Sequence, residues 1–109
     1  YPYVSAYCAA KHGVVGLTRA VALELASTDI TVNSICPGFT ETPLLERSVE
    51  NIIAKTGMSA DAAYQSLRAG NPQQRFIQTD EVAAMALWLC SEGARSVTGQ
   101  ALSMSGGEI

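Results

Sequence analysis

Residues 17–38, LTRAVALELASTDITVNSICPG, decide the fold class. The first part ends a helix that we predict over residues 5–26, with Ser5 as its N-cap. The second part, residues 30–36, is rich in β-branched and apolar residues and is followed by Pro37-Gly38, which predicts a strand. A helix, a short turn and a strand in this order form the second half of a βαβ unit. The stretch therefore indicates an α/β fold with a parallel sheet.

The predicted first helix carries two stripes of residues at helical spacing. One stripe is apolar and predicts a buried face; it comprises Ala6, Ala10, Gly13, Leu17, Val21 and Leu25. The other consists of small residues, namely Ala9, Gly13, Gly16 and Ala20. Because glycine weakens a helix, this second stripe predicts close backbone packing against a neighbour.

The remaining chain continues the alternation of helices and strands. Helices are predicted over residues 46–55 and 59–69, as an irregular excursion directly after the first strand. A further helix is predicted over residues 79–91, with Thr79 as its cap, and a short strand over residues 100–103. Two strands cannot form an independent sheet with helices on it, so the fold is expected to be incomplete alone.

Composition excludes several classes of protein. The chain has 109 residues, of which 48% are hydrophobic and 16% charged, and its net charge is −3. This low charge suggests a surface covered by further chain or by other subunits, although an Ala-rich small domain is the alternative. The absence of a basic stripe argues against nucleic-acid binding, and the absence of a long apolar stretch or a signal-like start argues against a membrane or secretory protein.

The three cysteines, Cys8, Cys36 and Cys90, give a further indication. Their spacing matches no metal motif, so no metal site is expected. We interpret them as reduced thiols of a cytoplasmic protein. The chain begins at Tyr1 rather than Met, and we therefore expect a fragment, a processed product or a trimmed chain.

Tyr7 and Lys11 lie four residues apart on the predicted helix, so their side chains share one face. An ammonium close to a phenol favours the phenolate, and such a tyrosine can act as a general acid or base. Tyr-x-x-x-Lys occurs by chance in many helices, and on the pair alone an amphipathic tyrosine and a solvated lysine remain the alternative interpretation.

The surrounding sequence resembles the short-chain dehydrogenase/reductase family. The run YCAAKHGVVGLTR at residues 7–19 resembles the active-site helix of that family, and ITVNSICPG at residues 30–38 resembles its following strand and Pro-Gly turn. FTETP at residues 39–43 resembles the cofactor-contacting loop. The segments at residues 78–83, 97–100 and 105–107 resemble the last helix, last strand and closing turn, although many members have Asp where this chain has Ser105.

The resemblance implies a fold and an activity. The chain would be the C-terminal portion of one Rossmann-type, doubly wound domain over residues 1–109. Its parent would be an NAD- or NADP-dependent oxidoreductase that moves a hydride between the nicotinamide and a carbonyl or secondary alcohol. The sequence around Tyr7 and through the last helix is most similar to that of 3-hydroxybutyrate dehydrogenases and 3-oxoacyl thioester reductases. A homo-oligomer, tetramer or dimer, is implied as well.

The same resemblance assigns roles to six residues. Tyr7 would transfer the proton, and Lys11 would favour the phenolate and hold the ribose hydroxyls of the cofactor. Pro37 and Gly38 would approach the nicotinamide. The backbone of Thr40 and the hydroxyl of Thr42 would contact the carboxamide or the phosphates, with ordinary helix capping as the alternative for both.

Several interpretations stay open from the sequence. The Gly-rich loop and the catalytic serine precede the tyrosine in this family, so the chain alone is expected to be inactive. It could be a non-catalytic fragment that only oligomerises, and extended-type nucleotide-sugar epimerases or reductases share Tyr-x-x-x-Lys. Asn33 is expected to fix local hydrogen bonds. Phe39, Leu44 and Leu45, together with the helical insert, could form an apolar wall or lid for the substrate.

Overall fold

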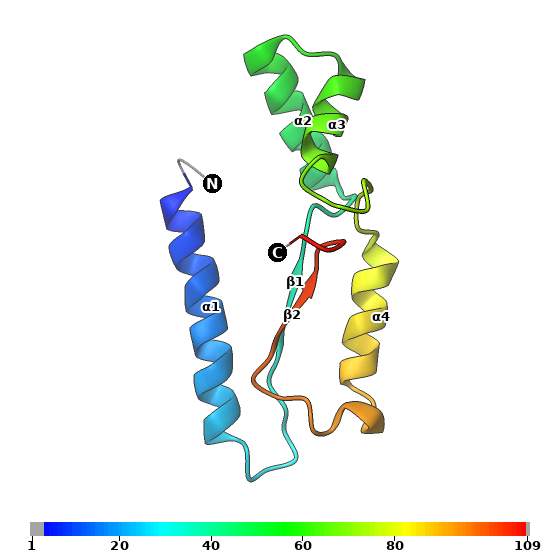
Figure 1. Cartoon of the computed structure of the whole chain (residues 1–109). Helices are drawn as coiled ribbons and strands as arrows, with labels where there is room; N and C mark the ends of the chain where they lie inside the picture. The colour runs from blue at the N-terminus through cyan, green and yellow to red at the C-terminus, as the bar shows by residue number, and fades with distance from the viewer. Residues whose placement is uncertain (1–3, 109) are drawn as a thin grey trace. The chain divides into compact units, whose positions relative to one another are not determined.

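The computed structural model describes residues 4–108. In chain order the elements are α1 (Ser5–Glu24), β1 (Ser34–Pro37), α2 (Pro43–Thr56), α3 (Ala60–Arg68), α4 (Thr79–Leu89), a 3-10 turn (Glu92–Ala94) and β2 (Ala101–Met104), as labelled in Figure 1. The chain divides into two units. The first unit contains residues up to 35 together with 86–102, and the second contains residues 36–85 and those from 103 onward.

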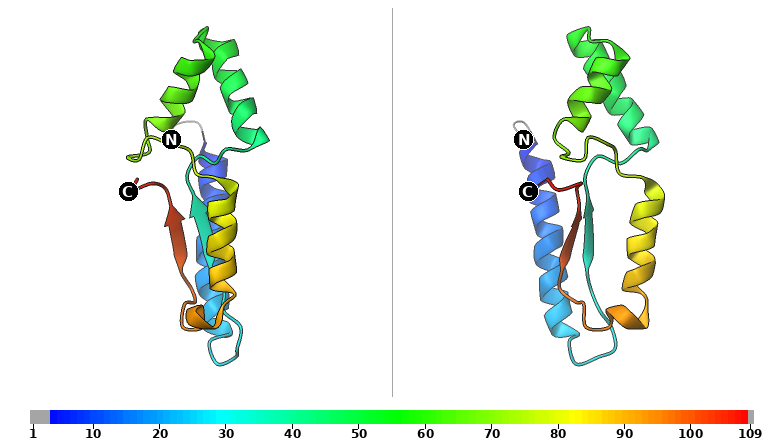
Figure 2. Two further views of the ribbon diagram at one scale, coloured as in Figure 1. Left: turned by 90° about the vertical axis from the view of Figure 1, so that its right-hand side faces the viewer. Right: turned by 45° about the vertical axis from the view of Figure 1, so that its right-hand side comes forward.

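Strands β1 and β2 pair side by side, as both views in Figure 2 show. The Ser34 N–H donates to the Gln100 carbonyl over 2.9 Å, and the Gly38 N–H donates to the Met104 carbonyl over 3.0 Å. The paired residue numbers rise together along both strands, which makes the pairing parallel. The predicted α/β fold with a parallel sheet is confirmed.

Strand β1 is shorter than the predicted strand over residues 30–36 and begins only at Ser34. Ahead of it, the Asn33 side chain is bonded to the segment before β2: its amide nitrogen donates to the Val97 carbonyl over 2.9 Å, and its oxygen accepts from the Gln100 N–H over 3.1 Å. At Asn33, hydrogen bonds from the side chain therefore take the place of the backbone hydrogen bonds that would pair this segment with the chain before β2. Asn33 thus fixes hydrogen bonds beside the strand, as predicted, but its partners are 64 and 67 residues away in the sequence.

Helix α1 begins at Ser5, but the prediction that Ser5 caps it is wrong. The N-cap is Val4, which makes no side-chain hydrogen bond, and Ser5 is the first helical residue. A serine inside the first turn cannot accept from the N–H groups that a cap serves. The helix ends at Glu24, close to the predicted end.

The packed face of α1 differs from the predicted apolar stripe. Thr18 and Ala22 are buried, whereas Leu17 is 64% exposed. Burial of Thr18 is possible because its hydroxyl donates to the Val14 carbonyl over 2.8 Å. A side chain built at Gly13 or Gly16 would meet nothing within 4 Å among the described residues, so the small-residue stripe has no close neighbour there.

Helix α2 begins at Pro43, three residues before the predicted start. Proline fits the first helical position because its missing N–H is not needed there. The preceding Thr42 is the N-cap, and its hydroxyl accepts from the Leu45 N–H at 3.4 Å. Gly57 closes the helix in the left-handed conformation, with φ of 71°.

Helix α3 confirms the helix predicted over residues 59–69. Ser59 is its N-cap, and the Ser59 hydroxyl accepts from the Ala62 N–H over 3.2 Å. Helices α2 and α3 contact each other. After α3 the chain reaches Phe76 and Ile77, which are buried. There the rings of Tyr64 and Phe76 meet edge to face with 5.9 Å between their centroids. The buried apolar residues of this unit are Leu45, Val49, Ala63, Phe76 and Ile77.

Helix α4 is capped differently from the prediction. Thr79 is its first residue rather than its cap. The carboxylate of Glu81 reaches back and accepts from the Gln78 N–H over 2.7 Å, as the third residue of a capping box does. Within residues 4–108, no helix combines the length and hydropathy needed to cross a bilayer.

Candidate active site

Tyr7 and Lys11 lie on the N-terminal part of α1, in the first unit. The Lys11 Nζ lies 5.2 Å from the centroid of the Tyr7 ring. The predicted common face of the two side chains is thereby confirmed. Tyr7 is 63% exposed, so its hydroxyl is accessible to a ligand. A cation at this distance over an aromatic ring is attracted by the ring electrons.

The loop from Pro37 to Thr42 follows the carboxyl end of β1 and belongs to the second unit. The Gly38 N–H donates to the Met104 carbonyl, so the carboxyl ends of β1 and β2 are joined at this point. A Cβ atom added at Gly38 would lie 3.4 Å from the Ser105 Cα. A Cβ atom at Gly38 would therefore be in ordinary contact with the segment after β2. Crevices at the carboxyl ends of parallel strands are the ligand sites of open α/β sheets.

Thr40 forms an isolated parallel bridge with Ile77. The bonds of this bridge use the neighbours of Thr40: the Ile77 N–H donates to the Phe39 carbonyl, and the Glu41 N–H donates to the Ile77 carbonyl, each over 2.9 Å. In a parallel bridge the N–H and C=O of the central residue face the opposite side. The Thr40 hydroxyl donates to the Gly38 carbonyl over 3.0 Å. The backbone of Thr40, rather than its hydroxyl, is thus directed away from the bridge.

Thr42 caps α2, as the alternative interpretation of its sequence position predicted. Its hydroxyl accepts one hydrogen bond from the Leu45 N–H. A hydroxyl also carries a donor hydrogen and a second lone pair. The capping bond is therefore compatible with a further contact to a ligand.

The three apolar residues expected to form a substrate wall separate in the structure. Phe39 is 46% exposed and Leu44 is 68% exposed. Leu45 is buried in the core of the second unit, and it points about 100° away from Leu44 around the helix. The pattern of apolar letters alone could not separate a surface leucine from a core leucine.

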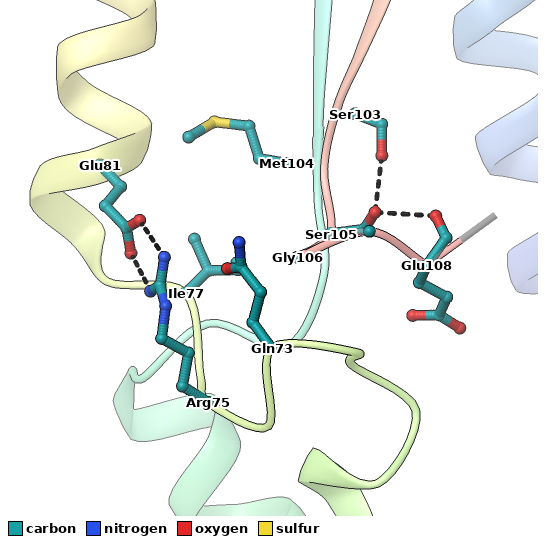
Figure 3. A pocket seen from close by; sticks show the side chains of 10 residues that line it. Gln73, Arg75, Ile77, Glu81, Ser103, Met104, Ser105, Gly106 and Glu108 are labelled. Atoms are coloured by element: carbon teal, nitrogen blue, oxygen red, sulfur yellow. Dashed lines mark hydrogen bonds and ion pairs between the residues drawn. The ribbon is translucent and has the colours of Figure 1, made fainter.

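A cavity of about 430 Å³ lies within the second unit, and its lining was not predicted from the sequence (Figure 3). Arg75 and Glu81 form a bidentate pair on one side, with both nitrogen to oxygen distances at 2.8 Å. The Arg75 guanidinium, and then the hydrogen bond from the Gln78 N–H, lower the pKa of Glu81 from 4.5 to about 2. The acidic residues in the first turn of α4 were visible in the sequence. The partner of Glu81 could not be predicted, because Arg75 lies six residues upstream, which is outside the spacing of helical neighbours.

The opposite side of this cavity is formed by the end of β2 and the segment after it. Ser103 Oγ donates to Ser105 Oγ over 3.0 Å, and Ser105 Oγ donates to the Glu108 carbonyl over 2.9 Å (Figure 3). Across the described part of the chain, no group of three or more His, Cys, Asp or Glu is placed to hold a metal ion.

Comparisons with known proteins agree with this architecture. The family model described as "Enoyl-(Acyl carrier protein) reductase" matches residues 1–108. A crystal structure of a short chain dehydrogenase family protein from Francisella tularensis has a TM-score of 0.94 and 30% identity, with 99% of this chain and 45% of that one covered. The chain belongs to the short-chain dehydrogenase/reductase family.

Two further relatives are more similar in sequence. A D-beta-hydroxybutyrate dehydrogenase of Rhizobium meliloti is 43% identical over 107 residues, which cover 97% of this chain and 42% of the relative. A variant of the actinorhodin polyketide ketoreductase, solved with NADPH, is 43% identical with a TM-score of 0.90, and 98% of this chain and 41% of that one are covered. The chain thus spans less than half the length of these relatives.

Proposed function

We propose that the parent protein is an NAD- or NADP-dependent oxidoreductase that interconverts a carbonyl and a secondary alcohol. The observation that carries the proposal is the pair on α1, an exposed Tyr7 with the Lys11 ammonium over its ring. This pair occurs in a chain of the short-chain dehydrogenase/reductase family. We propose further that residues 1–109 are the C-terminal part of a single Rossmann-type domain.

In this function Tyr7 handles the proton. During reduction its hydroxyl donates a proton to the carbonyl oxygen of the substrate, and during oxidation it removes the proton from the alcohol. Lys11 stabilises the phenolate through its charge and holds the ribose hydroxyls with its three N–H donors. A bound nicotinamide would supply or accept the hydride.

The loop after β1 supplies the proposed cofactor contacts. The Gly38 N–H is already bonded to Met104, so Pro37 and Gly38 would contribute shape rather than a donor. The outward backbone of Thr40 would bond the carboxamide. The second lone pair or the hydrogen of the Thr42 hydroxyl would bond the carboxamide or a phosphate. The residues present therefore fit a nicotinamide cofactor.

The proposed substrate is a 3-oxoacyl or 3-hydroxyacyl compound. Two relatives support this substrate class. One is named for the oxidation of hydroxybutyrate, which is a hydroxyacyl compound, and the other is named for the reduction of a polyketide ketone. The second of these was solved with NADPH, which supports NADP for that relative, and both NAD and NADP remain in the proposal.

A homo-oligomer, tetramer or dimer, is part of the proposal. Large apolar residues are exposed in the structure, among them Leu17 on α1 and Leu87 and Trp88 on α4. Further chain of the parent or other subunits would cover them.

Three unpaired thiols support a cytoplasmic location, and neither a nucleic acid nor a membrane is proposed as a partner.

The test uses the full-length parent protein. Absorbance of NADH and NADPH is followed during reduction of a 3-oxo acid and of a 3-oxoacyl thioester, with wild type and Tyr7→Phe compared. We expect turnover by wild type with at least one coenzyme and its loss in Tyr7→Phe. Unchanged turnover in the variant would refute the role of Tyr7, and no reduction of any carbonyl with either coenzyme would refute the function.

A further inference from the structure

The turn that follows β2 lies against the segment that returns from α3, which we call the return leg (residues 70–75). Gly106 has φ of 67°, and a Cβ atom added to it would overlap the side-chain amide of Asn71. The next residue, Gly107, has φ of 98°, but a Cβ atom there would lie 3.5 Å from Pro72, which is ordinary contact. The tightest approach of the terminal turn to the return leg is therefore between Gly106 and Asn71.

The side chain of Asn71 cannot easily move away from this contact. Its oxygen accepts from the Gln73 N–H, and its nitrogen donates to the Arg75 carbonyl, both over 2.7 Å. Both ends of the amide are thus bonded to the backbone of the return leg. A displacement of the amide would break one of these bonds or move the return leg with it.

The terminal turn is equally tied to the loop after β1. The Met104 carbonyl accepts from the Gly38 N–H over 3.0 Å, and the Ser105 Cα would lie 3.4 Å from a Cβ atom at Gly38. The hydroxyl of Ser105 bonds the Glu108 carbonyl and holds the turn closed (Figure 3). Contacts therefore run without interruption from the proposed cofactor loop at Gly38 through the terminal turn to Asn71.

The return leg determines where helices α2 and α3 stand. The excursion leaves the loop after Thr40 and rejoins it at Ile77, where the bridge closes it. Between α3 and the bridge, the chain is shaped by the Asn71 bonds and by Gln74, which adopts φ of 56°. A shift of the return leg would accordingly be transmitted to α3.

We propose that Asn71 is a positioning residue, which holds the α2–α3 hairpin in register with the carboxyl end of β2 by its contact with Gly106. This inference rests on the proposed function and on the expectation from the sequence that the helical insert forms a wall or lid for the carbonyl substrate. Asn71 itself does not touch the reacting atoms. Its contact fixes the distance between the wall of the substrate site and the cofactor loop.

The test compares Gly106→Ala with Gly107→Ala in the full-length protein. Both variants place an L side chain at a positive φ, and only the first forces a Cβ atom into the Asn71 amide. We expect Gly106→Ala to raise KM for the carbonyl substrate roughly five- to tenfold with kcat changed less than about twofold, and Gly107→Ala to leave KM near wild type. Equal KM values in the two variants would overturn the proposal.

A double-mutant cycle separates the contact from general damage to the fold. In an Asn71→Ala background the obstructing amide is gone, so Gly106→Ala should then raise KM no more than Gly107→Ala does. Strictly additive effects of Asn71→Ala and Gly106→Ala would contradict the inferred contact.

Hydrogen exchange provides a readout that does not depend on activity. In the ligand-free full-length protein, peptides that cover residues 59–75 should exchange faster in Gly106→Ala than in wild type and in Gly107→Ala, while peptides of α1 stay unchanged. Identical exchange over residues 59–75 would overturn the inference even if the enzyme is active. If the protein reduces no carbonyl, the proposed function fails, and the exchange experiment still decides whether the contact exists.

Discussion

The Lys11 ammonium lies over the ring of Tyr7, one helical turn away, at 5.2 Å from its centroid. The two residues sit on the exposed N-terminal part of α1, and their relation requires no distant contact because the helix itself sets it. This local origin is the reason the sequence could predict the shared face. It also makes the pair the first target for substitution.

Removal of the Tyr7 hydroxyl should abolish most of the activity. Tyr7→Phe keeps the ring and its contact with Lys11 but removes the proton carrier, so kcat/KM of the full-length enzyme should fall roughly 10²- to 10⁴-fold. The rate is measured by coenzyme absorbance, and circular dichroism checks that the fold persists. Tyr64→Phe is the matched control, because the ring that meets Phe76 is retained; it should leave kcat/KM within about twofold of wild type.

Loss of the Lys11 charge should affect both chemistry and cofactor binding. Lys11→Met retains much of the side-chain length but no charge or donor, so kcat/KM should fall about 10²-fold and the Kd of the coenzyme should rise. Fluorescence titration measures the Kd. The control is Lys55→Met at the exposed last turn of α2. Equal coenzyme affinity in wild type and Lys11→Met would contradict the ribose contact.

Thr42→Ala should destabilise α2 whether or not the hydroxyl also contacts a cofactor. The bond to the Leu45 N–H is lost, which should lower the free energy of unfolding by about 1 kcal/mol in denaturant titration. Ser59→Ala, which removes the corresponding cap of α3, is the comparison and should cost a similar amount. If only Thr42→Ala also weakens coenzyme binding, the hydroxyl has the second role; if both leave binding unchanged, that role is refuted.

The ion pair of Glu81 with Arg75 should make stability depend on pH at the acid end. The hydrogen bond from Arg75 is the main reason that the pKa of Glu81 is lowered from 4.5 to about 2. A lowered carboxyl pKa stabilises the folded state above pH 4.5, and this stabilisation is lost as the pH falls from 4.5 towards 2. Wild type should therefore exceed Glu81→Gln in Tm at pH 6, and the difference should shrink towards pH 2.

Salt and a second ion pair provide the controls for this pH dependence. The Arg75 and Glu81 side chains are 47% and 32% exposed, so added salt should reduce the Tm difference at pH 6. Glu92→Gln removes the longer pair with Arg95 at 3.4 Å, whose side chains are more exposed, and should change Tm less. A Tm difference for Glu81→Gln that is constant from pH 6 to pH 2 would contradict the prediction.

The sequence predicted elements that depend on local pattern and missed the features that depend on distant partners. The helix predicted over residues 59–69 depends on local pattern, and it is confirmed as α3. The start of β1 was wrong because Asn33 bonds residues more than sixty positions away, which no local pattern reveals. The cap at Thr79 was wrong because the Glu81 carboxylate serves the preceding Gln78 instead.

The candidate site shows the same division. The family resemblance identified the loop after β1, but it assigned Gly38 only to the approach of a cofactor, whereas in the structure the Gly38 N–H donates to the Met104 carbonyl. The pair of Arg75 and Glu81 was not foreseen, because its spacing follows a turn and not a helix or strand period. Leu17 was predicted on the buried face and is exposed, whereas its neighbour Thr18, whose hydroxyl donates to the Val14 carbonyl, is buried.

The bridge between Thr40 and Ile77 gives the excursion a single point of departure and return. The two bonds of the bridge are made by backbone atoms, so the bridge itself places no demand on the identity of the intervening residues. Loops that begin and end at one place tolerate changes in length at small entropic cost. Residues 42–76 are thus a candidate for exchange, and a hairpin from another member of the family could be grafted there to alter substrate preference, provided that the graft keeps Asn71 beside Gly106.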